Sequence, residues 1–335
     1  MQQEATGIQM PVWASLSSRG GRPDNQDRCG DAPTPGGRGF VVADGLGGHA
    51  AGAVAAAACV DACLDALKGH GELGRERLQA AFDAAQRAVQ DAPRRDPSAE
   101  GCRTTAVVIE LAPGRAIWGH VGDTRLYHFR DGVIAHQTLD HSMPQALVQA
   151  GAIRPDEIRR HPERNRLLKS LGGEGEASPT LLEEPIAVSP GDAFLLCTDG
   201  FWEHVTEADM EAALAGAAGP AEWLERMESQ VVRMATGAFD NYSATAVIVR
   251  DRGARTAPAP AGVGKTLLRL AAAVLLAAAA VAGARCAFAP DRRHPLILSG
   301  GPAGRLPAGG DALGREGAPQ LHSVPAEPAV SVVGS

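Results

Sequence analysis

Five aspartates in this sequence of 335 residues lie at the end of a short apolar run or just outside one. They are Asp27, Asp44, Asp123, Asp199 and Asp240. Asp44 is the clearest case, because it follows the apolar run 40–43 and precedes three glycines within four residues. A carboxylate buried at a strand end costs stability unless it is paired or binds a metal ion. An ordinary Asp-Gly turn explains any single position, whereas the recurrence indicates one shared site.

A set of carboxylates without accompanying histidine or cysteine clusters favours hard cations such as Mg²⁺ and Mn²⁺ over zinc. Two such ions about 3.5–4 Å apart can bridge one water, lower its pKa towards about 7 and direct it at a phosphorus atom. Arg22 lies five residues before Asp27 and offers a guanidinium group for phosphoryl oxygens. The pattern therefore predicts metal-dependent chemistry on a phosphate.

The elements that must position these residues indicate an α+β domain. We expect strands over 12–17, 39–43, 104–111, 116–121, 126–130, 186–188, 193–197 and 244–249. We expect helices over 50–68, 73–90, 143–160, 207–215 and 221–235. The strands come in consecutive groups and do not alternate strictly with helices, which is typical of antiparallel sheets.

Composition excludes several classes of protein. The net charge is −7 and no basic stripe is present, so we expect no nucleic-acid partner. The six cysteines form no Cys-x-x-Cys pair and several lie in apolar runs, which indicates reduced thiols and a cytoplasmic catalytic part. Residues 1–11 lack a basic segment followed by an apolar core, so we expect no secretory signal.

The texture of the sequence changes after residue 250. Residues 251–265 are a linker, 266–289 an apolar segment, and 290–335 a Gly/Pro/Ala-rich tail that we expect to be disordered. The uninterrupted apolar run 270–284 is shorter than the roughly 20 residues of a membrane span. Apolar neighbours extend this run, and Arg269 and Arg285 can snorkel. We therefore predict a single transmembrane helix over 266–289; an amphipathic or buried helix is disfavoured because no polar face exists.

The segment Gly262–Thr266 has part of the pattern of a phosphate-binding loop. The full pattern requires a glycine at position 259, where this sequence has Ala259, and no strand leads into the segment. We interpret this match as chance in a Gly/Ala-rich linker.

Six segments, in their order and spacing, resemble the motifs of the bacterial metal-dependent serine/threonine phosphatases of type 2C. They are 22–27 (RPDNQD), 42–48 (VADGLGG), 119–127 (GHVGDTRLY), 139–142 (LDHS), 191–200 (GDAFLLCTDG) and 240–247 (DNYSATAV). The resemblance covers about 12–250. It implies a sandwich of two antiparallel β-sheets flanked by α-helices, with residues 1–250 as the catalytic domain.

The resemblance also implies a metal centre with two Mn²⁺ or Mg²⁺ ions and, in many bacterial members, a third. Asp44 would bridge the first two ions, and the carbonyl of Gly45 would bind one of them. Asp199 and Asp240 would complete the shell of the first ion. Asp27 would hold metal-bound waters.

Further positions follow from the same resemblance. Asp123 would hold the third ion together with Asp199, and Arg22 would bind the substrate phosphate. The segment 147–171 would be the mobile flap over the cleft. His49 is a candidate general acid for the leaving oxygen, although its spacing from the Asp-Gly pair differs from other members; a solvent-facing histidine is the alternative.

The sequence departs from the family pattern at two places. Gln26 stands where an acidic residue is often found before the aspartate, which leaves the two-metal core intact. Arg103 precedes a pair of threonines where glycine is usual, and it replaces no metal ligand.

The expected activity is hydrolysis of phosphoserine and phosphothreonine in proteins, by a water or hydroxide bridged between two divalent metals. The enzyme would oppose a bacterial Ser/Thr kinase, with a cytoplasmic catalytic domain and a single pass through the inner membrane. The runs 199–203 and 240–243 resemble those of phosphatases found beside type VI secretion kinases, which suggests a type VI secretion link.

The sequence leaves two alternative functions. One is a phosphatase-like module that binds phosphoproteins with little or no turnover. The joint presence of Arg22, Asp27, Asp44, Asp199 and Asp240 weighs against it. The other is a phosphatase that acts on anti-anti-sigma factors. Such proteins carry an N-terminal sensor or receiver domain, whereas about eleven residues precede the first expected strand here.

Overall fold

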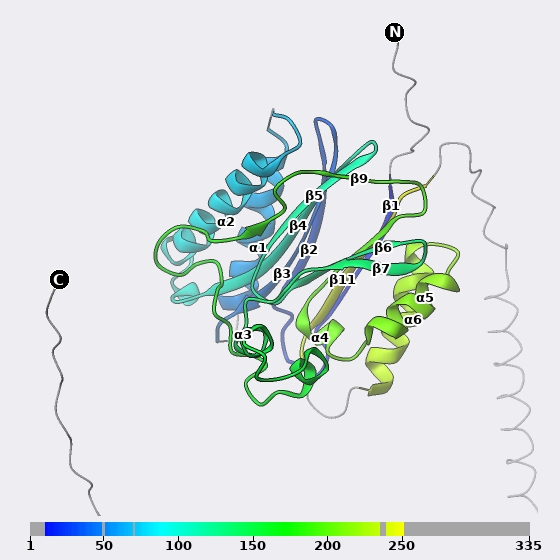
Figure 1. Ribbon diagram of the computed structural model, residues 1–335. Coiled ribbons are helices and arrows are strands. Elements are labelled where there is room, and N and C mark those ends of the chain that lie inside the picture. Colours follow the sequence, from blue (N-terminus) through cyan, green and yellow to red (C-terminus); the bar gives the residue numbers. More distant parts are fainter. Residues whose placement is uncertain (1–10, 49–50, 70, 235–238, 251–335) are drawn as a thin grey trace, which may run out of the picture. The chain divides into compact units, whose positions relative to one another are not determined.

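The computed structural model describes residues 11–48, 51–69, 71–234 and 239–250 (Figure 1). All of them belong to the first of two units of the chain, Met1–Ala257. Within these ranges, no helix has both the length and the apolar character needed to cross a membrane. The predicted linker, transmembrane helix over 266–289 and disordered tail lie outside the described residues.

The domain contains two antiparallel sheets. In order across the first sheet, the strands are β1 (Val12–Ser18), β11 (Tyr242–Ile248), β10 (Ala193–Cys197), β6 (Arg125–Arg130) and β7 (Val133–Gln137). In order across the second, they are β2 (Asp27–Thr34), β3 (Gly37–Leu46), β4 (Arg103–Ala112), β5 (Arg115–Val121) and β8 (Thr180–Leu181), and β9 (Ile186–Ala187) also pairs with β5.

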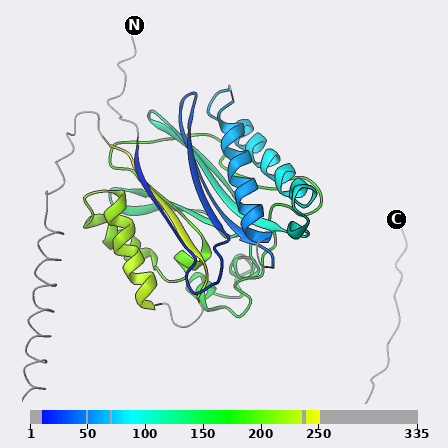
Figure 2. The same ribbon diagram turned by 180° about the vertical axis from the view of Figure 1, so that it is seen from behind.

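Helices cover the outer face of each sheet, so the domain has four layers (Figures 1 and 2). Over the second sheet lie α1 (Ala51–Leu67) and α2 (Arg75–Arg95). Over the first lie α4 (Asp199–Trp202), α5 (Glu207–Ala215) and α6 (Pro220–Met234). The remaining helices are α3 (Met143–Gln149) and the 3-10 helices η1 (Pro97–Ala99) and η2 (Pro155–Arg160).

Strand β3 shows why its sequence is uninterrupted and apolar. Successive side chains of a strand point to opposite faces of the sheet. Phe40 and Val42 face the cluster between the sheets, while Val41 and Ala43 face the cluster under α1 and α2. Both faces are therefore buried, and a strand covered on both sides is expected to be apolar throughout rather than alternating.

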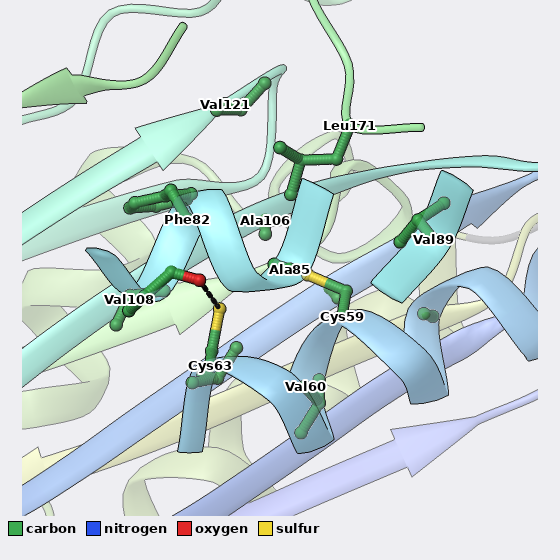
Figure 3. Close-up of a cluster of buried hydrophobic side chains, with 14 of the residues drawn as sticks. Cys59, Val60, Cys63, Phe82, Ala85, Val89, Ala106, Val108, Val121 and Leu171 are labelled. Atoms are coloured by element: carbon green, nitrogen blue, oxygen red, sulfur yellow. Dashed lines mark hydrogen bonds between the residues drawn. The ribbon is translucent and has the colours of Figure 1, made fainter. Parts of the chain in front are cut away.

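The helix-covered cluster of the second sheet contains small residues where α1 meets α2. Figure 3 shows Cys59, Val60 and Cys63 of α1 against Phe82 and Ala85 of α2. The thiol of Cys63 donates to the carbonyl of Ala81 over 3.6 Å. All five cysteines of the described residues are free thiols, as the sequence predicted.

The predicted sandwich of antiparallel sheets flanked by helices is confirmed, with local differences. The expected helix over 143–160 is divided into α3 and η2, because Gly151 adopts φ +71° and ends the helical path, as glycine commonly does. Strand β2 was missed because its sequence lacks an apolar alternation and contains Pro33, which an edge strand tolerates.

The apolar cluster between the two sheets predicts a large loss of stability when one of its aromatic side chains is truncated. Phe40 is fully buried between the sheets and lies 5.6 Å from the ring of Trp13. We expect Phe40→Ala to lower the free energy of unfolding by about 3–5 kcal/mol in urea denaturation. The control is Val133→Ala on β7, where 55% of the residue is exposed, with an expected change within about 0.5 kcal/mol. Equal effects of the two variants would contradict this placement of the core.

Candidate active site

The strand connections bring the five aspartates to one end of the sandwich. Asp27, the first residue of β2, and Asp44, two residues before the end of β3, are direct cross-strand partners. Asp199 follows β10 and Asp240 precedes β11; because these strands are antiparallel neighbours, both residues lie at the same end. Asp123 follows β5, whose last residue, Val121, pairs with β4 next to the partner of Asp44.

A pocket of about 210 Å³ opens at this end. It is lined by the predicted site residues Arg22, Asp44, Gly45, Asp123, Asp199 and Asp240, together with Gln26, Leu46, Gly47, Asn165, Leu167 and Asn241. Asp27 is not among the lining residues, and only 8% of its surface is exposed. His49 lies outside the described residues.

Asp27 is held by a layer of hydroxyl groups that replaces apolar packing at this end. Thr198 donates from Oγ1 to Oδ2 of Asp27 over 2.9 Å, and accepts the backbone N–H of Ser243 over 3.0 Å. The other carboxylate oxygen, Oδ1, is buried and has no hydrogen-bond partner among the described residues. Burial raises the pKa of Asp27 to about 7. A water on a bound cation would supply the missing partner.

Gly45 is required by close contacts of the backbone. A Cβ atom at this position would lie 2.0 Å from the carbonyl oxygen of Gly52, at the start of α1. The N–H of Gly45 donates to the carbonyl of Gln26 over 3.1 Å, and Thr104 donates from Oγ1 to the carbonyl of Asp44 over 2.7 Å. These bonds fix the backbone on which Asp44 is carried.

Asn241 was missed as a functional residue by the sequence reasoning, although it directly follows Asp240. Its side chain accepts the N–H of Gln26 and donates to the carbonyls of Arg19 and Asp24, each over 2.8 Å. One buried amide therefore clamps the loop that carries Arg22. The guanidinium of Arg22 donates to Oδ2 of Asp240 over 2.9 Å.

Asp123 is fixed mainly through the backbone around it. The indole N–H of Trp202 donates to its carbonyl over 2.9 Å. The neighbouring Gly122 donates its N–H to Nδ1 of His141 over 3.1 Å, which assigns that histidine a positioning role. Burial, and then the charge of Asp140, raise the pKa of Asp123 to about 7.

The segment 147–171, predicted as a flap, is held at its C-terminal end by backbone hydrogen bonds. Leu168 donates its N–H to the carbonyl of His141 over 2.8 Å, and Leu171 exchanges two backbone hydrogen bonds with Thr104. Arg164 and Glu203 form an ion pair at 2.8 Å. Asn165 and Leu167 line the pocket, so this end of the segment contributes a wall of the site.

The carboxylates of the pocket destabilise one another when they are charged. The pKa of Asp44 is raised well above its usual value by burial and then by the charges of Asp199 and Asp27. Burial and the charge of Asp123 raise the pKa of Asp199 in the same way. Such a group of partly buried acids is stabilised by either protons or cations.

The donor set fits hard divalent cations. It consists of carboxylates and the Gly45 carbonyl, and it leaves an unpartnered oxygen on Asp27. Within the described residues, no three acidic, histidine or cysteine side chains are already gathered closely enough to enclose a metal ion. Mg²⁺ commonly binds through one or two carboxylates and keeps several waters.

A two-sheet sandwich with helices on both outer faces and a carboxylate pocket at one end defines the class of metal-dependent phosphatase folds. The sequence profile described as Protein phosphatase 2C matches residues 18–233, and the chain belongs to this family. The resemblance drawn from the six motifs is thereby confirmed.

Named relatives agree with this assignment. The serine/threonine protein phosphatase PstP of Mycobacterium tuberculosis is 36% identical over 205 residues, which are 60% of this chain and 38% of PstP. The chain thus spans well under half the length of this curated relative. A crystal structure of the PstP catalytic domain in complex with two manganese ions superposes with a TM-score of 0.62 at 32% identity, covering 73% of this chain and 99% of that one.

A further solved structure is described as PppA, a key regulatory component of the type VI secretion system in Pseudomonas aeruginosa. It has 28% identity and a TM-score of 0.59, and the match covers 72% of this chain and 99% of that chain.

The raised pKa of Asp44 predicts that removing its charge stabilises the metal-free protein. Deprotonation of a carboxyl with a raised folded-state pKa opposes folding, and the penalty grows as pH rises above about 4. We expect Asp44→Asn to raise the free energy of unfolding by about 1–3 kcal/mol at pH 8 in chelator, and by much less at pH 4.

The measurement is urea denaturation at both pH values, with Asp65→Asn on the exposed surface of α1 as the control. The control should show no gain at either pH. A metal-free Asp44→Asn protein that is less stable than the wild type at pH 8 would refute the electrostatic account of the pocket.

Proposed function

We propose that this chain is a Mn²⁺- or Mg²⁺-dependent phosphatase that hydrolyses phosphoserine and phosphothreonine in proteins. The observation that carries the proposal is the convergence of Asp44, Asp123, Asp199 and Asp240 with Arg22 on one pocket. Membership of the family and the manganese-bound PstP domain support the same reaction.

Each residue of the site has a proposed role that follows from its chemistry. Asp44, the Gly45 carbonyl, Asp199 and Asp240 would hold two ions, and Asp123 with Asp199 a third. The ions would supply an activated water as nucleophile and positive charge for the phosphoryl group. Asp27, below the pocket, would orient water through its free oxygen Oδ1.

Arg22 is positioned to bind the phosphate of the substrate. More than half of its side chain is exposed, and Asn241 fixes the loop that carries it. A guanidinium group can donate two parallel hydrogen bonds to phosphate oxygens. The pair with Asp240 places this cation beside the acids that would hold metal. His49 is the proposed proton donor to the leaving oxygen.

Partners and location are inferred from the expected activity. We propose a cognate Ser/Thr kinase as the opposing enzyme and a membrane tether through 266–289. A role beside type VI secretion is supported by the likeness to PppA and by the runs 199–203 and 240–243. A non-catalytic module that binds phosphoproteins is not favoured, because Asp44, Gly45, Asp123, Asp199 and Asp240 line one pocket.

Metal dependence tests the reaction. The full chain should release phosphate from a phosphothreonine peptide with Mn²⁺ or Mg²⁺ and lose this activity in excess chelator. We expect Asp199→Asn to reduce kcat by about 10²–10³-fold, the usual cost of removing one key electrostatic group. Asp65→Asn should be as active as the wild type. Folded, metal-binding protein that turns over no phosphopeptide would instead favour the binding module.

A reporter fusion tests the tether. A reporter joined after Arg293 should be extracytoplasmic if residues 266–289 span the membrane once with the catalytic domain inside. The same reporter joined after Arg250 should be cytoplasmic and serves as the control. Cytoplasmic reporter activity from both fusions would rule out the span.

A further inference from the structure

A second pocket adjoins the active site. Its volume is about 390 Å³, and Leu167 lines both this pocket and the one that contains the aspartates. The backbone is fixed on both sides of Leu167. Met143 donates its N–H to the carbonyl of Arg166, and Leu168 donates its N–H to the carbonyl of His141, each over 2.8 Å. A peptide bound across the aspartates can therefore extend past Leu167 into a preformed space.

Two cationic side chains line this second pocket, Arg103 and Lys169. Arg103 is the first residue of β4 and is the cross-strand partner of Leu46, which lines the active-site pocket. It is exposed, and its guanidinium lies beside Gly173, where an added Cβ would be 3.7 Å from Nη1.

Neither cation is neutralised by direct contact within the described part of the chain. Arg103 has no ion pair there, and Lys169 donates one hydrogen bond, to the carbonyl of Ser178 over 3.3 Å. Glu174 and Glu176 also line the pocket, but no ion pair joins either to Arg103 or Lys169. In the active-site pocket, by contrast, Arg22 is paired with Asp240.

The loop that carries the two glutamates is held to α2. Gln86 donates from Nε2 to the carbonyls of Gly173 and Gly175, over 2.9 and 3.0 Å, and accepts the N–H of Gly172 over 2.9 Å. This anchoring fixes the backbone on both sides of Glu174. The backbone of this wall therefore has a defined position beside Arg103.

We propose that Arg103 and Lys169 bind a second anionic group of the phosphoprotein substrate, close in sequence to the phosphorylated residue. The group is a carboxylate or a second phosphate, since a guanidinium fork binds either in a bidentate manner. This inference rests on the proposed function, because it extends the same substrate beyond the metal pocket. Arg103 is then a specificity residue and takes no part in the chemistry.

Phosphopeptide kinetics test the proposal with the full chain and Mn²⁺. The peptides carry one phosphothreonine with neutral neighbours, with glutamate moved through the neighbouring positions, or with a second phosphorylated residue. We expect kcat/KM to be about 3–10-fold higher for the best anionic peptides, the size expected of exposed ion pairs. The gain should lie in KM and shrink at high ionic strength.

Two variants and a control locate the effect. Arg103→Gln and Lys169→Gln should each reduce the preference and leave turnover of the neutral peptide unchanged. Arg115→Gln is the matched control, since Arg115 is exposed at the opposite end of β5 from Val121, which lines the pocket. The separation along the strand is about 20 Å. Arg115→Gln should keep the full preference.

The outcomes separate this inference from the proposed function. Metal-dependent turnover without preference for either anionic peptide, or a preference that survives in Arg103→Gln and Lys169→Gln, overturns the subsite and leaves the function standing. If no peptide is turned over, the proposed function fails, and anisotropy of the labelled doubly phosphorylated peptide in chelator still tests the subsite. Equal binding by the wild type and Arg103→Gln would then overturn it.

Discussion

Repulsion among partly buried carboxylates is the constraint on which the rest of this structure depends. The charge of Asp199 raises the pKa of Asp44, and the charge of Asp123 raises the pKa of Asp199, in addition to the effect of burial on each. Nothing about an isolated strand would keep these groups together. They stay together because the apolar core between the sheets and the two helix-covered faces stabilise the strands that carry them.

The interior of the sandwich changes character along its length. Phe40, Val42 and Phe194 fill the middle of the space between the sheets. Towards the site, strands β1 and β11 contribute hydroxyls, and Ser17 and Ser243 bond each other over 2.8 Å. A hydroxyl layer of this kind satisfies backbone and carboxylate groups without excluding water completely. The site therefore begins where the core ends, with no separate framework to support it.

Several features could be predicted from the sequence because they depend on local pattern. The aspartates near strand ends are one example, since an apolar run of four to six residues identifies the strand that carries them. Asp44 lies two residues before the end of β3, and Asp199 lies two residues after the end of β10. The grouping of strands likewise predicted antiparallel sheets, and the six motifs led to the family.

Other features depend on contacts between distant residues and leave no local signal. The register that sets Asp27 opposite Asp44 was not evident, because β2 lacks the alternation of a half-buried strand. The clamp formed by Asn241 joins residues more than two hundred positions apart, so nothing near Asn241 marks its partners. The division of the expected helix over 143–160 depends on the positive φ of Gly151, which competes with the helix-forming residues around it.

The order of the elements has a consequence for when the site can form during synthesis. The loop that carries Arg22 is made among the first residues of the domain, yet the amide that holds it belongs to Asn241, next to the last described strand. Strand β11 also lies between β1 and β10, so until it is translated the first sheet is missing an internal member. A ribosome-bound chain that has not reached residue 240 lacks both Asp240 and the amide of Asn241. The domain thus completes the pocket lined by the aspartates only as its own translation ends.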